Sequence, residues 1–305
     1  WQRIEAIARE LHYSVDKNAS SLRSQRSNTI ALLFFEEQTP DDSKINPFYL
    51  AMLASITAQC ATRGYDLLIS FQRMEDDWHV RYQDSHRADG LILLGYGDFT
   101  LYASRLDQLI DQGTLFVRWG AVQDDGIGGT VGSDNAGGGR LAGEHLLAQG
   151  RRNIAFIGQP DEHYPEFANR FKGLLQALDK EGIKHDPRLK RNAVSFEESG
   201  YAAARSLLEA GVPFDGLFAA SDLIAIGAMR ALTEAGLTIP GDVAVVGFDD
   251  ILAARHTNPP LTTLVQDMQA AGRLLVDTVV ARIEGRDPPP AMIPARLVVR
   301  GSTTG

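Results

Sequence analysis

From Thr29 onward, short apolar runs alternate with longer amphipathic segments along most of the chain. The apolar runs are hydrophobic at nearly every position rather than at every second one. That pattern is typical of strands covered on both faces, as in a parallel sheet. It predicts strands over residues 29–35, 65–71, 89–95, 115–120, 153–158, 216–221 and 243–248.

The segments between these runs carry helix signals. One begins near Pro47, repeats apolar residues at helical spacing and reaches Gly64 where a C-cap glycine is expected. Another opens with Ser221 and Asp222 as a cap and closes at Gly236. Strands and helices in alternation indicate βαβ units with right-handed crossovers, hence an α/β fold.

The end of the chain departs from this repetition. Residues 261–267 are predicted as a connecting segment, followed by a helix over 268–284, a proline-rich loop and a final strand. A closed barrel of eight repeated units is therefore not favoured. The pattern predicts two doubly wound parallel-sheet lobes with a ligand cleft between them. The predicted N-terminal lobe covers 29–152 plus 268–292, and the C-terminal lobe covers 153–267 plus 293–305.

Residues that follow the strands should face this cleft. Tyr164 and Arg170 come after one predicted strand, and Asp222 and Asp249 come after two others. Asp134 precedes the helix predicted at 136–149. Aromatic rings cover the apolar faces of sugars, and charged groups hydrogen-bond their hydroxyls, so this set favours a sugar or a similar uncharged ligand.

Each of these residues also has a structural interpretation. Asp222 could be a helix N-cap, and Asp249 could be a turn residue. Arg170 alone could be a solvated or ion-paired side chain of an amphipathic helix, and Trp119 could belong to the core. Their shared location at strand ends favours a binding site.

A glycine-rich segment raises a different possibility. Gly137, Gly139 and Ala142 fit a dinucleotide-binding fingerprint, with Asp161 about 20 residues beyond. The fingerprint should follow a buried strand, whereas only a weak strand is predicted here. The sequence also lacks common hydrolase, zinc-protease and phosphate-loop motifs, so an enzyme, a cofactor and a metal site are not expected. Among the histidines, His163 is the best candidate for the pocket, although a surface position is favoured for it.

Charge and cysteine content restrict the partners. The 305 residues carry a net charge of −9, and the five Lys or Arg in residues 1–30 exceed the three Asp or Glu there. Contact with nucleic acid is therefore expected only near the N-terminus. Cys60 is the single cysteine, which suits a reducing compartment. Because no apolar run reaches membrane-spanning length and no secretion signal is visible, a cytoplasmic protein without membrane contact is expected.

Several segments in one consistent order resemble the LacI/GalR-type bacterial transcription regulators. They are "IARELHYS", "NASSLRSQRSNTIALL", "NPFYLAML", "GSDNAGGGRLAGEHLLAQGRRNIAFIG", "R-x-x-G" at Arg170–Gly173, "ASDLIAIGAMRALTEAGLTIPGDVAVVGFDD", "LTTLVQD" and "LVVRGST". Together they span nearly the full length. The resemblance implies a periplasmic-binding-protein-like fold in the two lobes. It also implies that residues 1–28 are the remnant of a helix-turn-helix head and its hinge.

The resemblance further implies roles for individual residues. In the hinge, "NASSLRSQ" would become helical on operator DNA, with the Leu22 side chain wedged into the minor groove. The implied hinge contacts to DNA are Tyr13, Ser14, Leu22 and Arg23. Between the lobes, the family positions together with the strand-end residues give a candidate effector set of Phe48, Tyr49, Asp134, Tyr164, Arg170, Phe196, Asp222 and Asp249. Ser221 departs from the family, whose members often carry Asn there.

The sequence thus predicts a homodimeric, DNA-binding repressor controlled by a small saccharide. A sugar-binding protein of a transport system is the alternative, because it shares the two-lobed architecture. The hinge-like N-terminus favours the repressor.

Overall fold

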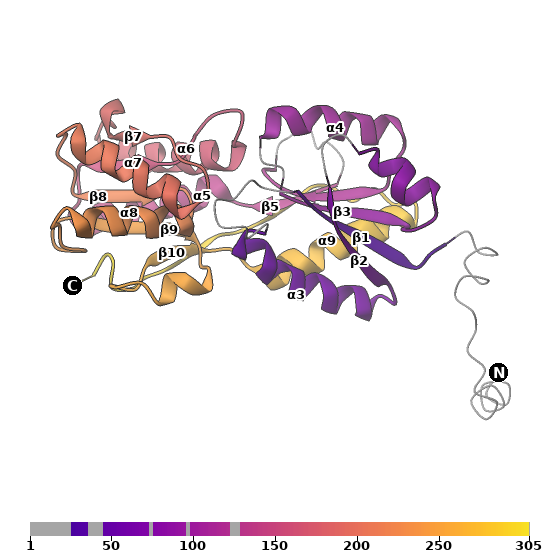
Figure 1. The fold of residues 1–305 in the computed structure, drawn as a ribbon. Coiled ribbons are helices and arrows are strands. Elements are labelled where there is room, and N and C mark those ends of the chain that lie inside the picture. The colour runs from indigo at the N-terminus through magenta and orange to yellow at the C-terminus, as the bar shows by residue number, and fades with distance from the viewer. Residues whose placement is uncertain (1–25, 36–44, 73–75, 96–97, 123–128, 305) are drawn as a thin grey trace, which may run out of the picture.

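The computed structural model describes residues 26–35, 45–72, 76–95, 98–122 and 129–304. The predicted hinge contacts Tyr13, Ser14, Leu22 and Arg23 lie outside these residues. Two α/β lobes lie side by side, and segments of the chain run from one to the other between them (Figure 1). The predicted two-lobed α/β architecture is confirmed.

The first lobe contains a sheet whose strands are all parallel, in the order β11-β5-β4-β3-β1-β2. These strands are β1 (Thr29–Phe35), β2 (Asp66–Gln72), β3 (Gly90–Leu94), β4 (Phe116–Trp119), β5 (Gly129–Ser133) and β11 (Ala291–Ile293). Helices α3 (Pro47–Thr62) and α9 (Met268–Ile283) pack together on this sheet. Helix α4 (Phe99–Asp111) and the π-helical turn η1 (His79–Asp84) belong to a separate core cluster.

Strand β1 shows why the sequence is apolar at consecutive positions. Leu32 belongs to the core cluster that contains residues of α3 and α9, whereas its neighbour Leu33 belongs to the cluster formed with α4 and η1. Successive side chains of a strand point to opposite faces, so a sheet with helices on both faces needs apolar residues throughout. The pattern therefore predicted this strand correctly.

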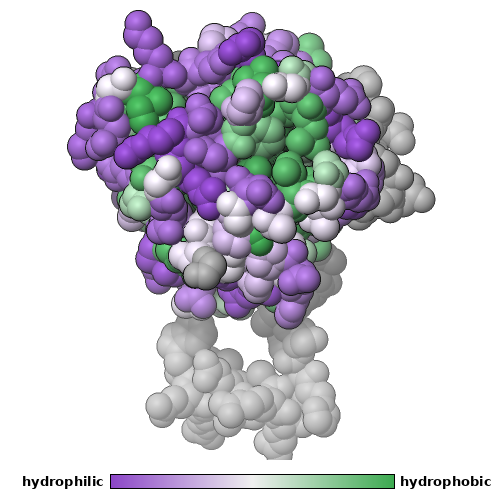
Figure 2. All heavy atoms as spheres, turned by 90° about the vertical axis from the view of Figure 1, so that its left-hand side faces the viewer, coloured by the Kyte–Doolittle hydropathy of each residue, from purple (hydrophilic) through white to green (hydrophobic). Residues whose placement is uncertain are grey.

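The second lobe repeats the architecture with the strand order β12-β10-β9-β8-β6-β7, in which β12 alone is antiparallel among the described strands. Its strands are β6 (Ile154–Ile157), β7 (Lys190–Arg191), β8 (Gly216–Ala219), β9 (Ala244–Asp249), β10 (Thr262–Val265) and β12 (Arg296–Val298). Its helices are α5 (Asn135–Ala148), α6 (Pro165–Lys180), α7 (Glu197–Glu209) and α8 (Asp222–Glu234), with short 3-10 turns η2 (Pro187–Leu189) and η3 (Leu252–Arg255). Helices α5 and α6 pack against each other, as do α7 and α8. The end of this lobe presents hydrophobic residues bordered by polar ones (Figure 2).

Two expectations about strands were wrong. The predicted connecting segment at 261–267 contains β10, which pairs with both β9 and β12. The segment judged a weak strand is the fully buried β5, between β4 and β11. Both strands are rich in Thr, Gly or Ser, and their neighbours in the sheet rather than their own hydrophobicity hold them in place.

The chain passes between the lobes at three places within the described residues: around Asp134, at 265–268 and at 293–296. Helix α5 packs on α6 and on strands of the second lobe. Helix α9 returns to the first lobe, where it contacts α3, β3 and β4. The boundaries predicted from the sequence stay a prediction; the contacts of helix α5 are with elements of the second lobe.

The glycine-rich segment serves helix packing. A Cβ atom on Gly139 would lie 1.9 Å from the carbonyl oxygen of Arg170, and one on Gly173 would lie 2.0 Å from that of Ala136. Only glycine permits α5 and α6 to approach so closely. At the start of α5, Asp134 Oδ1 accepts a hydrogen bond of 2.8 Å from the Gly137 amide. A carboxylate therefore already occupies the helix N-terminus that would bind a phosphate.

None of the helices in the described part of the chain combines the length and the hydrophobicity needed to span a bilayer.

Replacing Gly139 with Ala should destabilise the protein by about 2 kcal/mol, because the new methyl group overlaps backbone atoms of α6. Urea unfolding would measure the change. Arg140→Ala, at the exposed neighbouring position, is the control and should cost much less, because its ion pair with Glu144 is exposed to solvent. A Gly139→Ala midpoint equal to that of the wild type would contradict the close-packing explanation.

Candidate functional site

The C-terminal ends of the parallel strands of both sheets meet at the junction between the lobes. After β4, the amide of Ala121 donates to Glu166 Oε1 across the junction at 2.8 Å. After β3, the amide of Phe99 donates to the carbonyl oxygen of His163 at 3.0 Å. Strand ends at such a junction are the usual ligand-binding position in open α/β sheets.

Arg170 is the positively charged residue of the candidate effector set. It is buried, with 5% of its surface exposed. Its Nε donates to Asn135 Oδ1 at 2.8 Å, and its Nη1 donates to the carbonyl oxygen of Ala220. The guanidinium carbon lies 3.7 Å from the centre of the Phe248 ring. Burial lowers the pKa of Arg170, and the negative charge of Asp249 acts in the opposite direction. The solvated alternative for Arg170 is therefore wrong.

Asp249 supplies the nearest opposite charge. Its Oδ1 lies 3.9 Å from Arg170 Nη1 and accepts a hydrogen bond of 2.7 Å from Gln266 Nε2. Burial raises the pKa of Asp249 to about 6, although Arg170 and Gln266 oppose the change. The backbone φ of Asp249 is +121°, which is rare for any residue other than glycine and recurs at functional sites.

Asp222 lies beneath this turn and has no exposed surface. Its Oδ1 accepts from the Thr263 hydroxyl at 2.6 Å, and its Oδ2 accepts from the Ile251 amide at 2.9 Å. Burial, together with the charge of Asp249, raises its pKa well above the ordinary value. Ser221, not Asp222, caps helix α8. The Asp222 carboxylate thus fastens the turn that carries Asp249 to strand β10.

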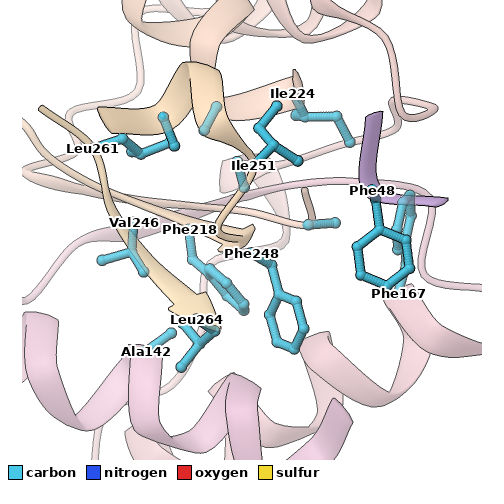
Figure 3. Packing of buried hydrophobic residues seen from close by; sticks show 14 of the residues in the cluster. Phe48, Ala142, Phe167, Phe218, Ile224, Val246, Phe248, Ile251, Leu261 and Leu264 are labelled. Atoms are coloured by element: carbon cyan, nitrogen blue, oxygen red, sulfur yellow. The ribbon is translucent and has the colours of Figure 1, made fainter. Parts of the chain in front are cut away.

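Aromatic side chains from both lobes lie near the charged pair: Phe167 and Phe248 face the Arg170 guanidinium, and Phe48 lines the same hollow as Asp249. Phe48 packs edge to face with Tyr49 at a centroid distance of 5.2 Å and lies 6.0 Å from the Trp119 ring. Tyr164 stacks on Phe167 at 5.6 Å. Figure 3 shows Phe48, Phe167 and Phe248 within one hydrophobic cluster, to which the two lobes both contribute.

The two remaining predicted residues lie at helix starts. Asp134 caps α5 as described above, and Phe196 immediately precedes α7 and is half-buried. Nearby, the Ser195 hydroxyl donates to Ser221 Oγ at 2.8 Å and accepts from Asn46 Nδ2 at 3.4 Å, which links the lobes at a further point.

Two residues of this site were not among the candidates predicted from the sequence: Gln266 and Glu166. Gln266 follows β10 directly, so it would have been found had that strand been predicted. Glu166 is half-buried, and burial raises the pKa of its carboxyl group. Asn135 follows Asp134 in the predicted strand-end segment and is almost fully buried.

A hollow of about 800 Å³ opens next to Asp249 and Gln266, near the segments that cross between the lobes. Phe48 and Met268 form part of its wall from the first lobe, and Arg296 lies where the chain crosses. Its volume falls in the range of small-molecule sites. Within the described residues, no group of three or more acidic, histidine or cysteine side chains is placed to hold a metal ion.

Comparisons with known proteins find the same architecture in transcription regulators. The model of a family described as "periplasmic binding protein-like domain" matches residues 144–303. The HTH-type transcriptional regulator CelR of Thermobifida fusca is 31% identical over 99% of this chain and 88% of its own length. A structure of a CelR–cellobiose complex superposes with a TM-score of 0.81 at 29% identity, covering 99% of this chain and 90% of that one. A LacI family regulator from Enterococcus faecium with bound ribose has a TM-score of 0.74 at 27% identity, covering 90% and 98%.

The buried carboxyl group of Asp249 should make stability depend on pH. Because its folded-state pKa exceeds the ordinary value, its stabilising contribution is present in acid and is lost as the pH rises from about 4 through about 6. Asp249→Asn should therefore show a smaller loss of unfolding free energy between pH 5 and pH 7 than the wild type. Urea unfolding at the two pH values tests this, with Asp179→Asn on the exposed surface of α6 as control. Identical slopes for wild type and Asp249→Asn would refute it.

Proposed function

The chain belongs to the LacI family of transcription regulators, and from this premise we propose that it represses transcription by binding an operator, under the control of a saccharide held between its lobes. The observation that carries the effector site is the buried Arg170, with Asp249 at 3.9 Å and aromatic rings around both. This combination offers both the polar and the apolar contacts that a sugar ring requires.

Arg170 and Asp249 suit neighbouring hydroxyl groups. The guanidinium only donates hydrogen bonds, and an ionised carboxylate only accepts them. Together they can therefore bond to a sugar hydroxyl both as an acceptor and as a donor. Gln266 donates to Asp249 through its amide nitrogen, which keeps its amide oxygen as a further acceptor. The negative charge of Asp249 beside Arg170 would repel a phosphate group, so the uncharged saccharide is preferred.

The predicted effector residues divide into two roles in this proposal. Arg170, Asp249, Phe48, Tyr49, Tyr164 and Phe196 contact the saccharide. Asp222 and Asp134 support the site, because their carboxylates are engaged by Thr263 and Ile251 and by the start of α5, respectively. Asp222 acts by holding the turn at Asp249 rather than by reaching the ligand.

Effector binding would change the affinity for operator DNA by changing how the two lobes are oriented relative to each other. The site draws on both lobes, so a bound saccharide favours one relative orientation of them, and coupling of this kind is worth about 1–3 kcal/mol. Residues 1–28 precede the first lobe and would carry the change to the operator, with Leu22 and Arg23 at the minor groove. This is the action of a cytoplasmic regulator, and family membership disfavours the transport alternative.

Saccharide binding can be tested by thermal shift with ribose, cellobiose and other mono- and disaccharides. A ligand at 100 times its dissociation constant stabilises the folded protein by about 2.7 kcal/mol, which raises the melting temperature by a few degrees. Arg170→Lys should abolish that rise. The planar guanidinium can hydrogen-bond Asn135 and the ligand at the same time, whereas a lysine ammonium cannot reproduce that geometry. Lys180→Ala, at the exposed end of the same helix, should retain it.

A saccharide that stabilises Arg170→Lys as strongly as the wild type would remove Arg170 from the site. Stabilisation by nicotinamide or purine nucleotides alone would overturn the saccharide assignment itself.

We further propose that two copies associate through the side of the first lobe where α3 lies beside the edge strand β2. Leu50, Ile69 and Phe71 expose between 41% and 48% of their surface there. An exposed edge strand with large apolar side chains is a surface that soluble proteins normally cover.

Ile69→Lys should therefore shift the protein from dimer to monomer, since it introduces a charge into the apolar contact. Sedimentation velocity at micromolar concentration measures the change. Leu101→Lys is the matched control, because Leu101 is 66% exposed on α4 of the same lobe. Equal sedimentation of the two variants would exclude this surface as the dimer contact.

A further inference from the structure

The rim of the junction between the lobes carries an ion pair outside the candidate effector site. Asp98 is the N-cap residue of α4 in the first lobe, and His163 lies between β6 and α6 in the second. His163 Nδ1 lies 2.8 Å from Asp98 Oδ2. Both helices lie along the same edge of the molecule, one in each lobe (Figure 1).

The backbone reinforces this pair. The amide of Phe99 is the first of helix α4 and has no partner within its own helix, as at every helix start. It donates to the carbonyl oxygen of His163 at 3.0 Å, while the carboxylate of Asp98 accepts from the Thr100 amide at 2.9 Å. The start of a helix in the first lobe is thus capped partly by its own Asp98 and partly by the second lobe.

We propose that Asp98 and His163 form a clasp that holds the two lobes together around the effector and that loosens when His163 loses its proton. Neither residue belongs to the candidate effector set, so both act as positioning residues. They would determine how long the effector stays bound. The effect on the effector rests on the proposed function, whereas the clasp itself does not.

The charges around His163 support this behaviour. The hydrogen bond with Asp98 raises the pKa of His163 above its ordinary value, and the charges of Asp98, Asp161 and Glu162 add to the increase. Burial alone would raise the pKa of Asp98, but hydrogen bonds from Thr100 and His163 bring it below the ordinary value. A raised histidine pKa means that the contact is complete below the ordinary value of about 6.5 and is lost as the pH rises through the higher one.

The other charged groups near the clasp do not reverse this dependence of the contact on pH. A hollow of about 530 Å³ beside it is lined by Phe99, Asp161, Glu162 and Lys172, so water and protons reach the pair. Behind Phe99, the guanidinium carbon of Arg118 lies 5.4 Å from its ring centre. Glu166 forms the neighbouring bridge to the first lobe; burial raises its pKa, whereas the hydrogen bond from the Ala121 amide acts in the opposite direction.

The first test needs no ligand. Imidazole signals of histidine-labelled protein, assigned with His163→Gln, give the pKa of His163 by NMR titration. In the wild type it should lie above 6.5, and in Asp98→Asn it should fall towards 6.5. Asn remains a good N-cap, so helix α4 is preserved. Because the two residues belong to different lobes, this fall directly reports their contact, and an unchanged pKa would overturn the clasp.

The second test measures effector release by stopped flow, with cellobiose as the probe, at pH 6 and pH 8. Release from the wild type should be about threefold faster at pH 8, the size expected for a partly exposed ion pair. Asp98→Asn and His163→Gln should each abolish that difference, while Asp107→Asn on the same helix should keep it. A pH effect that persists in both clasp variants would overturn the proposal. A wild type that binds no saccharide would count against the proposed function, and the NMR titration would then decide the clasp alone.

Discussion

The buried guanidinium of Arg170 is the constraint on which the organisation of the second lobe and the cleft depends. A charge removed from water is tolerated only where hydrogen bonds and an opposite charge replace its hydration. Here these come from separate elements: Asn135 at the start of α5, Ala220 after β8 and Asp249 at the end of β9. The ring of Phe248 covers the flat face of the guanidinium. One side chain of α6 therefore requires the start of α5 and the ends of β8 and β9 to lie at the same place.

The surrounding residues make this arrangement possible. Glycines at the α5–α6 contact bring Asn135 within reach of Arg170, because any side chain there would push the helices apart. Asp222 holds the turn after β9 through the Ile251 amide, and that turn gives Asp249 its unusual backbone conformation. The strained turn and the buried charges are unfavourable in free energy, and the packing of the whole lobe offsets them. Such strain is common at binding sites.

The sequence predicted those parts of the fold that local patterns determine. Strands such as β1 were found because both faces of the sheet are covered, whereas β5 and β10 were misjudged because their Gly and Thr residues are held by neighbouring strands. Strand-end positions correctly brought Arg170 and Asp249 together. Their burial was not predictable, since the partners of Arg170 come from distant parts of the chain. His163 was the histidine judged most able to reach the pocket, although a surface position was favoured for it. Its contact with Asp98 places it at the rim, and no local signal connects residues 65 positions apart.

The order of the elements has a consequence for synthesis. Helix α9 and strand β11 complete the first lobe, yet they lie after nearly all of the second lobe in the chain. A ribosome adds residues from the N-terminus at about 5–20 per second, so β1, β3 and β4 emerge many seconds before the helix that covers them. During that interval the apolar face destined for α9 has no cover from its own chain. The second lobe, whose strands β6 to β10 and helices α5 to α8 are contiguous in the chain, is the part that can begin to fold before synthesis ends. Strands β11 and β12, one for each lobe, are synthesised last.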